Sequence, residues 1–184
     1  ATLHFLDSLC LTRYVKLEGK QMVDVGTGAG FPGLPLRLAV PDLQLTLLDS
    51  LGKRITFLEE VCTDLGLSNV ACVHGRAEEF AAAHREQFDY AVSRAVAALP
   101  MLVELCLPLV RPGGAFLAMK SVDSDEELQS AAHAISVLGG RVAAKENYRI
   151  PGTQVQHRLI VIEKVSPTPA KYPRGFAKIK KSPL

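Results

Sequence analysis

The sequence predicts a doubly wound α/β fold with a mostly parallel, seven-stranded sheet and an antiparallel hairpin at one edge. Three observations support this prediction. Short apolar runs alternate with helical patterns along the chain, as in sheets whose strands are joined by helices. Most of these runs are apolar throughout, which is typical of strands buried on both faces. The last two runs have no helix between them, so we expect them to pair antiparallel at an edge.

The seven strand-like runs follow one another in a regular order. They are residues 21–25, 43–49, 69–74, 88–95, 114–120, 141–150 and 157–165. The first five are joined by helical segments, and such crossovers make neighbouring strands parallel.

Three of the connecting segments carry clear helix signals. After the second strand, apolar residues recur at helical spacing, and Gly66 supplies the left-handed residue that ends such helices. A helix over 99–107 has a proline in its first turn, where the missing N–H is not needed. Ser124 and Glu127 have the spacing of a capping box at the start of a third helix, which stops before the glycines at 139–140.

Composition is that of an ordinary globular protein, because 48% of the 184 residues are hydrophobic and 22% are charged. No apolar run is long enough to cross a bilayer, and nothing at the start resembles a signal peptide. We therefore expect a cytoplasmic protein without a membrane partner, and a monomer by default. The four cysteines and five histidines are scattered, so we expect no metal site.

Charge divides the chain into a domain over 1–165 and a basic C-terminal tail over 166–184. The last 21 residues contain no acid and hold six of the basic residues: Lys164, Lys171, Arg174, Lys178, Lys180 and Lys181. Subtracting this +6 from the net charge of +2 leaves −4 for the rest. A basic tail on an acidic body suggests a polyanionic partner, and a solvated, disordered terminus is the alternative.

The stretch "VDVGTGAGFPG" predicts a ligand-binding loop at the end of the first strand. Gly28, Gly30 and Gly33 fit the pattern G-x-G-x-x-G, which lets a backbone approach a ligand closely. Asp49 ends the second strand, where an acid commonly accepts hydrogen bonds from a ribose. A ligand-free tight turn and a helix-capping role for Asp49 with Ser50 are the alternatives.

Charge in this loop favours S-adenosylmethionine over a nicotinamide dinucleotide. Asp24 would repel a pyrophosphate, whereas it would attract an ammonium or a sulfonium. Pro32 also removes a backbone donor that a phosphate could use.

Five segments in this order resemble a known family: "DVGTGAGFPGLPL", "LLDSLGKRITFLEEV", "GRAEEF", "FDYAVSRAVA" and "RPGGAFLAMK". The chain is similar to the bacterial ribosomal small-subunit methyltransferase G family, also called glucose-inhibited division protein B, from residue 4 to residue 174. The resemblance implies a Rossmann-like class I methyltransferase. It also implies methyl transfer from S-adenosylmethionine to N7 of a guanosine in 16S ribosomal RNA, with that RNA or the small subunit as partner.

The resemblance adds site residues to those of the loop. Gly26 and Phe31 would lie around the methionine and adenosine, Ser50 at the ribose corner, and Ala77 with Glu78 beside the adenine. The expected cofactor contacts are Asp24, Gly26, Gly28, Phe31, Asp49, Ser50, Ala77, Glu78 and Arg94. Core packing for Phe31 and a helix-dipole role for Glu78 are the alternatives. Arg94 needs an anionic or π partner, which an internal acid could also supply.

Guanine N7 carries a lone pair and no proton, so no general base is required and no catalytic residue is assigned. Arg94 is expected to donate to guanine O6, and RNA contacts are expected at Arg94, Lys120, Lys171 and Arg174, with solvated side chains as the alternative for the lysines. Deletion of residues 170–184 is expected to lower RNA methylation and leave cofactor affinity nearly unchanged.

Three other functions remain compatible with the sequence. They are a nicotinamide-dependent oxidoreductase on the same fold, a non-enzymatic RNA-binding or ribosome-assembly factor, and a small-molecule methyltransferase.

Overall fold

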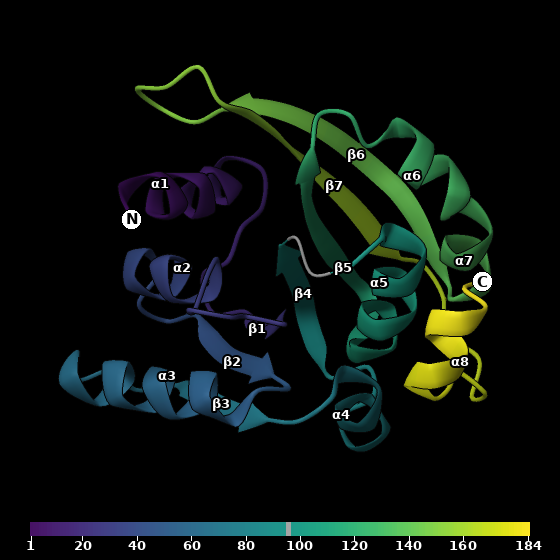
Figure 1. Cartoon of the computed structure of the whole chain (residues 1–184), viewed down its shortest axis with the longest axis horizontal. Coiled ribbons are helices and arrows are strands. Elements are labelled where there is room, and N and C mark those ends of the chain that lie inside the picture. Colours follow the sequence, from purple (N-terminus) through teal and green to yellow (C-terminus); the bar gives the residue numbers. More distant parts are fainter. Residues whose placement is uncertain (95–96) are drawn as a thin grey trace.

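A computed structural model describes residues 1–94 and 97–184. Seven strands form one sheet in the order β3-β2-β1-β4-β5-β7-β6 (Figure 1). Their bounds are β1 (Gln21–Val25), β2 (Gln44–Asp49), β3 (Val70–His74), β4 (Phe88–Arg94), β5 (Val110–Ser121), β6 (Gly140–Arg149) and β7 (Gln156–Lys164). The first five strands are parallel, and β7 runs antiparallel to both β5 and β6. The predicted fold class is confirmed; β5 is longer than predicted, and Ala95 of the predicted fourth strand lies outside the described residues.

Helices cover both faces of the sheet, as a doubly wound fold requires. One face packs against α1 (Thr2–Leu9), the 3₁₀ turn η1 (Cys10–Arg13), α2 (Gly33–Ala39) and α3 (Gly52–Asp64). The other packs against α4 (Ala77–Ala83), α5 (Leu99–Cys106), the 3₁₀ turn η2 (Leu107–Leu109), α6 (Asp125–Ser130), α7 (Ala132–Val137) and α8 (Phe176–Lys181). Each face therefore has its own apolar cluster. Among the described helices, none combines the length and the apolar character that a membrane span needs.

The predicted helices form, with one correction at the third. Gly66 has a φ of 62° directly after α3, and α5 has its proline in the first turn. The helix expected from Ser124 divides into α6 and α7, and Ser124 makes no capping hydrogen bond. The capping box is wrong because Arg158 donates to the Ser124 hydroxyl (3.3 Å), while Glu127 accepts from the Leu99 amide (2.6 Å). The sequence predicts a helix at α4 only as the connection between the third and fourth strands, and it predicts none at α1 and α8.

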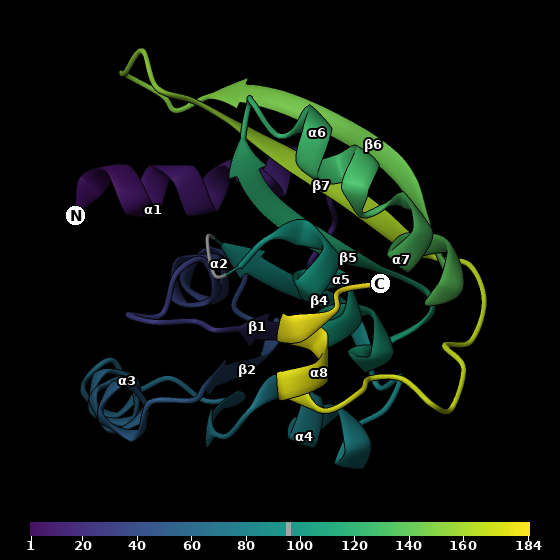
Figure 2. The ribbon, with the colours of Figure 1, turned by 45° about the vertical axis from the view of Figure 1, so that its right-hand side comes forward.

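The C-terminal segment lies against the domain, with α8 next to α5 in both views (Figure 2). Ile179 is completely buried in the same apolar cluster as α5. Arg85 donates to the carbonyls of Thr168 and Tyr172 at 2.6 Å each, which fixes the turn that leads to α8. Residues 166–184 are therefore ordered chain, and the predicted domain boundary at 165 stays a prediction.

Two of the six C-terminal cations make contacts that stabilise the fold. Lys164 is completely buried and donates to the carbonyls of Leu107 (2.7 Å) and Val110 (2.8 Å). The Arg174 guanidinium forms a two-pronged ion pair with the buried carboxylate of Glu104, at 2.7 and 2.9 Å. Glu104 thus occupies the fork of Arg174, and the RNA contact expected at this residue stays a prediction. The exposed cations of this segment are Lys171, Lys178, Lys180 and Lys181.

Candidate active site

The strand order reverses between β1 and β4, and ligands bind at such switch points, outside the carboxyl ends of the strands. The glycine loop leaves β1 at this point and enters α2. Gly26, Gly28 and Gly30 have φ values of 68°, 60° and 96°, which L side chains rarely adopt. A Cβ on Gly30 would lie 2.6 Å from Leu34, whereas one on Gly28 would meet nothing within 4 Å. The loop is therefore packed at Gly30 and open at Gly28.

Asp24, near the end of β1, holds this loop through hydrogen bonds. Its side chain is completely buried, and Oδ2 accepts from the Thr27 hydroxyl (2.7 Å) and the Gly33 amide (2.9 Å). Oδ1 is buried without a hydrogen-bond partner. Burial is the main cause that raises the pKa of Asp24 from 3.8 to about 7. Enclosed in this way, Asp24 orients the loop amides and adds negative potential beneath the site.

We expect Asp24→Asn to remove a pH dependence of stability. The folded state favours the protonated acid, so this group's contribution is full below pH 4 and is lost as the pH rises toward about 7. Asparagine keeps the acceptor for Thr27 and Gly33 without a charge. Urea unfolding should show similar stabilities at pH 4.5. At pH 8 the variant should be more stable, by up to about 4 kcal/mol at 1.36 kcal/mol per pKa unit. A difference that does not vary with pH would refute a raised pKa.

Asp49 lies beside the open part of the loop. It is 3% exposed, its Oδ2 accepts from the Gly28 amide (2.9 Å), and its Oδ1 accepts from the Leu51 amide (3.0 Å). Leu51 is the N-cap residue of α3, and this helix has no side-chain capping hydrogen bond, so the capping alternative for Asp49 with Ser50 is wrong. The structure thus brings Gly28 and Asp49 together at the carboxyl ends of β1 and β2.

The predicted adenine corner lies at the end of β3. Ala77 and Glu78 open α4, and Glu78 forms an ion pair with Arg76 at 2.6 Å. The same guanidinium lies over the Phe176 ring, 3.9 Å from its centroid, so α8 contacts this corner. Ser50 is exposed, and its carbonyl lies 3.1 Å from Nε2 of His74.

Phe31 has more neighbours than the sequence suggested. Its ring centroid lies 5.0 Å from that of Phe5 and 5.5 Å from that of His4, both on α1. These contacts support the alternative of packing for Phe31, because α1 lies against the loop. The guanidinium of Arg94 lies over the Phe31 ring, with 5.4 Å between the guanidinium carbon and the ring centroid.

Arg94 also lines a cavity of about 480 Å³ at the ends of β4 and β5. The other lining residues come from α1, β5 and β7: Leu3, His4, Asp7, Met119, Lys120, Ser121 and His157. Asp7 was not predicted as a site residue, although it lies within residues 4–174, over which the chain resembles the family. The internal acid considered for Arg94 is this residue, with Nη1 3.5 Å from Oδ2 of Asp7.

Lys120, where the sequence predicts an RNA contact, is paired with other parts of the chain, and that contact stays a prediction. Its ammonium lies 2.6 Å from the Glu127 carboxylate and donates to the carbonyl of Ala97 at 2.7 Å. Only a tenth of the side chain is exposed. Lys120 therefore ties β5 to the segments before α5 and in α6, and it has no free charge for a phosphate.

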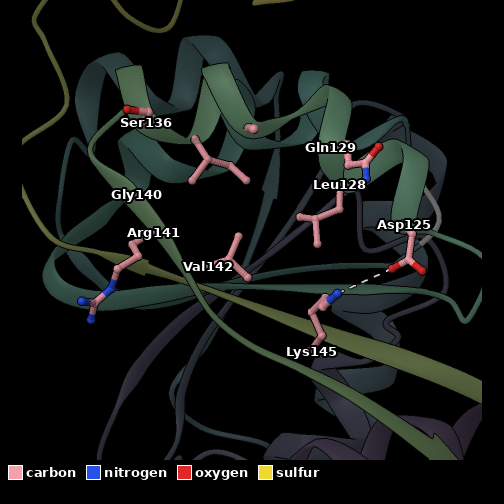
Figure 3. A pocket seen from close by; sticks show the side chains of 10 residues that line it. Asp125, Leu128, Gln129, Ser136, Gly140, Arg141, Val142 and Lys145 are labelled. Atoms are coloured by element: carbon pink, nitrogen blue, oxygen red, sulfur yellow. Dashed lines mark ion pairs between the residues drawn. The ribbon is translucent and has the colours of Figure 1, made fainter.

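A second hollow, of about 650 Å³, lies between α6, α7 and the edge strand β6 (Figure 3). Lys145 reaches Asp125 across it at 3.6 Å, and Leu128, Ile135 and Val142 form its apolar floor. None of the predicted site residues lines it. It also lies at the β6 edge of the sheet, and β4, β5 and β7 separate it from β1 and the glycine loop, so we assign the site to the loop and the cavity beside Arg94. Within the described residues, no group of three His, Cys, Asp or Glu side chains could hold a metal ion.

Comparison with known proteins identifies relatives of this arrangement. A family model described as rRNA small subunit methyltransferase G matches residues 1–156. A ribosomal RNA small subunit methyltransferase G from Alkaliphilus oremlandii is 54% identical, over 98% of this chain and 77% of its own length. The protein of the same name from Lachnoclostridium phytofermentans is 50% identical, over 98% and 76%.

Solved structures that share the fold are much more distant in sequence. A precorrin-6y C5,15-methyltransferase from Geobacter metallireducens has a TM-score of 0.63 at 15% identity, over 86% of this chain and 87% of its own. TrmN from Thermus thermophilus has a TM-score of 0.66 at 20% identity, over 85% and 48%. These likenesses show the fold of the chain.

Proposed function

The chain belongs to the rRNA small subunit methyltransferase G family, and from this premise we propose that it transfers a methyl group from S-adenosylmethionine to N7 of a guanosine in small-subunit ribosomal RNA. One observation carries the proposal. The glycine loop with Asp49 and the cavity with Arg94 adjoin at the switch point, where Phe31 of the loop contacts Arg94 of the cavity wall. One part suits a nucleoside cofactor, and the other suits the acceptor base.

The residues of the loop fit S-adenosylmethionine better than a dinucleotide. We propose that Asp49 accepts from the ribose hydroxyls, that Ala77 and Glu78 border the adenine, and that the backbone at Gly26 and Gly28 borders the methionine part. Asp49 beside the loop, together with the ionised form of Asp24 beneath it, favours a cationic ligand, whereas these charges would repel a pyrophosphate. Bound here, S-adenosylmethionine supplies an electrophilic methyl group. Family membership and this charge pattern together argue against a nicotinamide-dependent oxidoreductase.

The main requirement of this reaction is alignment of the acceptor base with the methyl group. Guanine N7 attacks with its lone pair, so the chain needs to hold the base in line with the methyl group and exclude water. Arg94 is placed to donate to guanine O6 from the cavity wall, since a donor on N7 itself would block attack. Leu3 and Met119 contribute apolar surface to the walls of this cavity.

Lys171 is the predicted tail residue that stays available for RNA. It is exposed, and its ammonium lies 5.3 Å from the ring centroid of Tyr172. With the exposed lysines of α8 it provides four positive charges on one short segment. We propose that this segment contacts phosphates, which gives an RNA affinity that falls with salt.

Labelled-methyl transfer tests this function directly. Small subunits from a strain that lacks the protein are incubated with the pure protein and S-adenosylmethionine carrying a labelled methyl group. The RNA is then digested and the modified base mapped. We expect one 7-methylguanosine per subunit and no label on subunits from the parent strain. Label at a different atom would refute the N7 assignment, and no label on either naked RNA or subunits would refute the activity.

A further inference from the structure

The cavity beside Arg94 contains a buried carboxylate to which the proposed mechanism gives no role. Asp7 is 2% exposed, and every one of its neighbours in this network comes from a different element. Its Oδ1 accepts from the Tyr148 hydroxyl of β6 at 2.6 Å and lies 3.0 Å from Nδ1 of His157 in β7. Its Oδ2 faces Arg94 of β4. Burying such a carboxylate costs free energy. Its role should therefore be sought in the side chains with which it interacts.

Resting on the proposed function, we infer that Asp7 is the positioning residue of the acceptor site, which orients Arg94 and balances its charge while the base becomes cationic. The structure holds Arg94 from two sides, by the carboxylate of Asp7 and by the ring of Phe31. Because Arg94 also lines the cavity, we expect its remaining guanidinium N–H groups to be available to a bound base.

The reaction itself explains why a negative charge is needed there. N7 forms a bond to the methyl carbon, the carbon–sulfur bond breaks, and its electron pair stays on sulfur. The positive charge therefore passes from the sulfonium to the imidazole part of the guanine, and no proton moves. A guanidinium beside this base would oppose the arriving charge in a poorly solvated cavity. The carboxylate of Asp7 offsets that charge and leaves Arg94 able to donate to O6.

Tyr148 and His157 keep Asp7 in place. Both lie on the β6–β7 hairpin, which reaches over α1 in Figure 1. Burial, together with the hydrogen bond to Asp7, raises the pKa of the Tyr148 hydroxyl, so it stays a donor at neutral pH. The carboxylate is thus held by the hairpin on one oxygen and directed at Arg94 with the other.

Asp7→Asn tests this inference, because asparagine keeps the acceptor for Tyr148 and His157 but loses the charge. Single-turnover methyl transfer to unmethylated small subunits should slow on the order of 100-fold. Affinities for S-adenosylmethionine and for the unmethylated subunit should stay within about threefold. Affinity for the methylated subunit should fall about tenfold, since only the product base carries the charge. Asp64→Asn, an exposed acid at the end of α3, is the matched control and should behave as the wild type.

A double-mutant cycle separates positioning from packing. If Asp7 acts through Arg94, Asp7→Asn should change the rate less than about threefold in an Arg94→Met background. Additive rate losses, or equal weakening of cofactor, substrate and product binding, would overturn the inference and leave a purely structural acid. A wild-type protein that methylates no small-subunit RNA would overturn the proposed function itself.

A second variant covers the case in which Asp7→Asn does not fold. Tyr148→Phe keeps the charge of Asp7 and should retain at least a tenth of the wild-type rate. A larger loss would contradict the claim that the charge of Asp7 is what supports the reaction.

Discussion

Replacing Asp49 by alanine should weaken the binding of S-adenosylmethionine by about 100-fold or more. The proposed ribose contacts are hydrogen bonds to a charged acceptor, which contribute about 1.5–3 kcal/mol each, and two of them correspond to at least a 100-fold change. The same change frees the amides of Gly28 and Leu51, which Asp49 holds at 2.9 and 3.0 Å. Isothermal titration with S-adenosylmethionine measures the affinity, and urea unfolding measures the stability.

The control for this variant is Asp42→Ala, an exposed acid shortly before β2, at the opposite end of that strand. Its affinity for S-adenosylmethionine should equal that of the wild type. Asp49→Asn keeps one acceptor oxygen and should lose about tenfold, between the wild type and the alanine variant. A folded Asp49→Ala protein whose affinity stays within threefold would show that Asp49 serves only the loop and the start of α3.

The strands of the sheet and the place of the glycine loop after the first strand could be predicted because they depend on local patterns. Apolar runs separated by helical spacing identify parallel strands whatever their partners are, and Gly66 marks the end of α3 by itself. The same holds for the loop glycines, since a positive φ is a property of the backbone at that residue. Asp49 was found for a similar reason, as an acid at a fixed distance along one βα unit.

Contacts between distant elements could not be predicted in this way. Lys120 and Arg174 look like free cations in the sequence, yet each has a carboxylate partner, in Glu127 and Glu104, that only the folded chain brings near. Glu127 also shows why the capping box failed, because a tertiary partner took the side chain that the local motif would use. Asp7 went unnoticed because its partners Tyr148 and His157 lie about 140 to 150 residues away.

Deleting residues 170–184 should destabilise the whole domain, which differs from the expectation that only RNA methylation falls. The deletion leaves Glu104 buried without Arg174, and breaking such a pair costs about 3–5 kcal/mol. It also removes Ile179 from the apolar cluster, a loss of about 1.5–3 kcal/mol. Domains of this size are stable by about 5–15 kcal/mol, so methyl transfer and cofactor binding should fall together. Urea unfolding and titration with S-adenosylmethionine measure both losses.

A second substitution identifies the cause of that loss. Glu104→Leu within the truncated chain removes the unpaired charge, so it should restore about 2–4 kcal/mol of the free energy of unfolding. If truncation lowers RNA methylation with stability and cofactor affinity unchanged, the segment acts as an RNA contact alone. The full-length variant with Lys178, Lys180 and Lys181 all changed to alanine isolates that contact, since these side chains are exposed. It should keep its stability and its affinity for S-adenosylmethionine, and its RNA affinity should become less dependent on salt because fewer phosphates are neutralised.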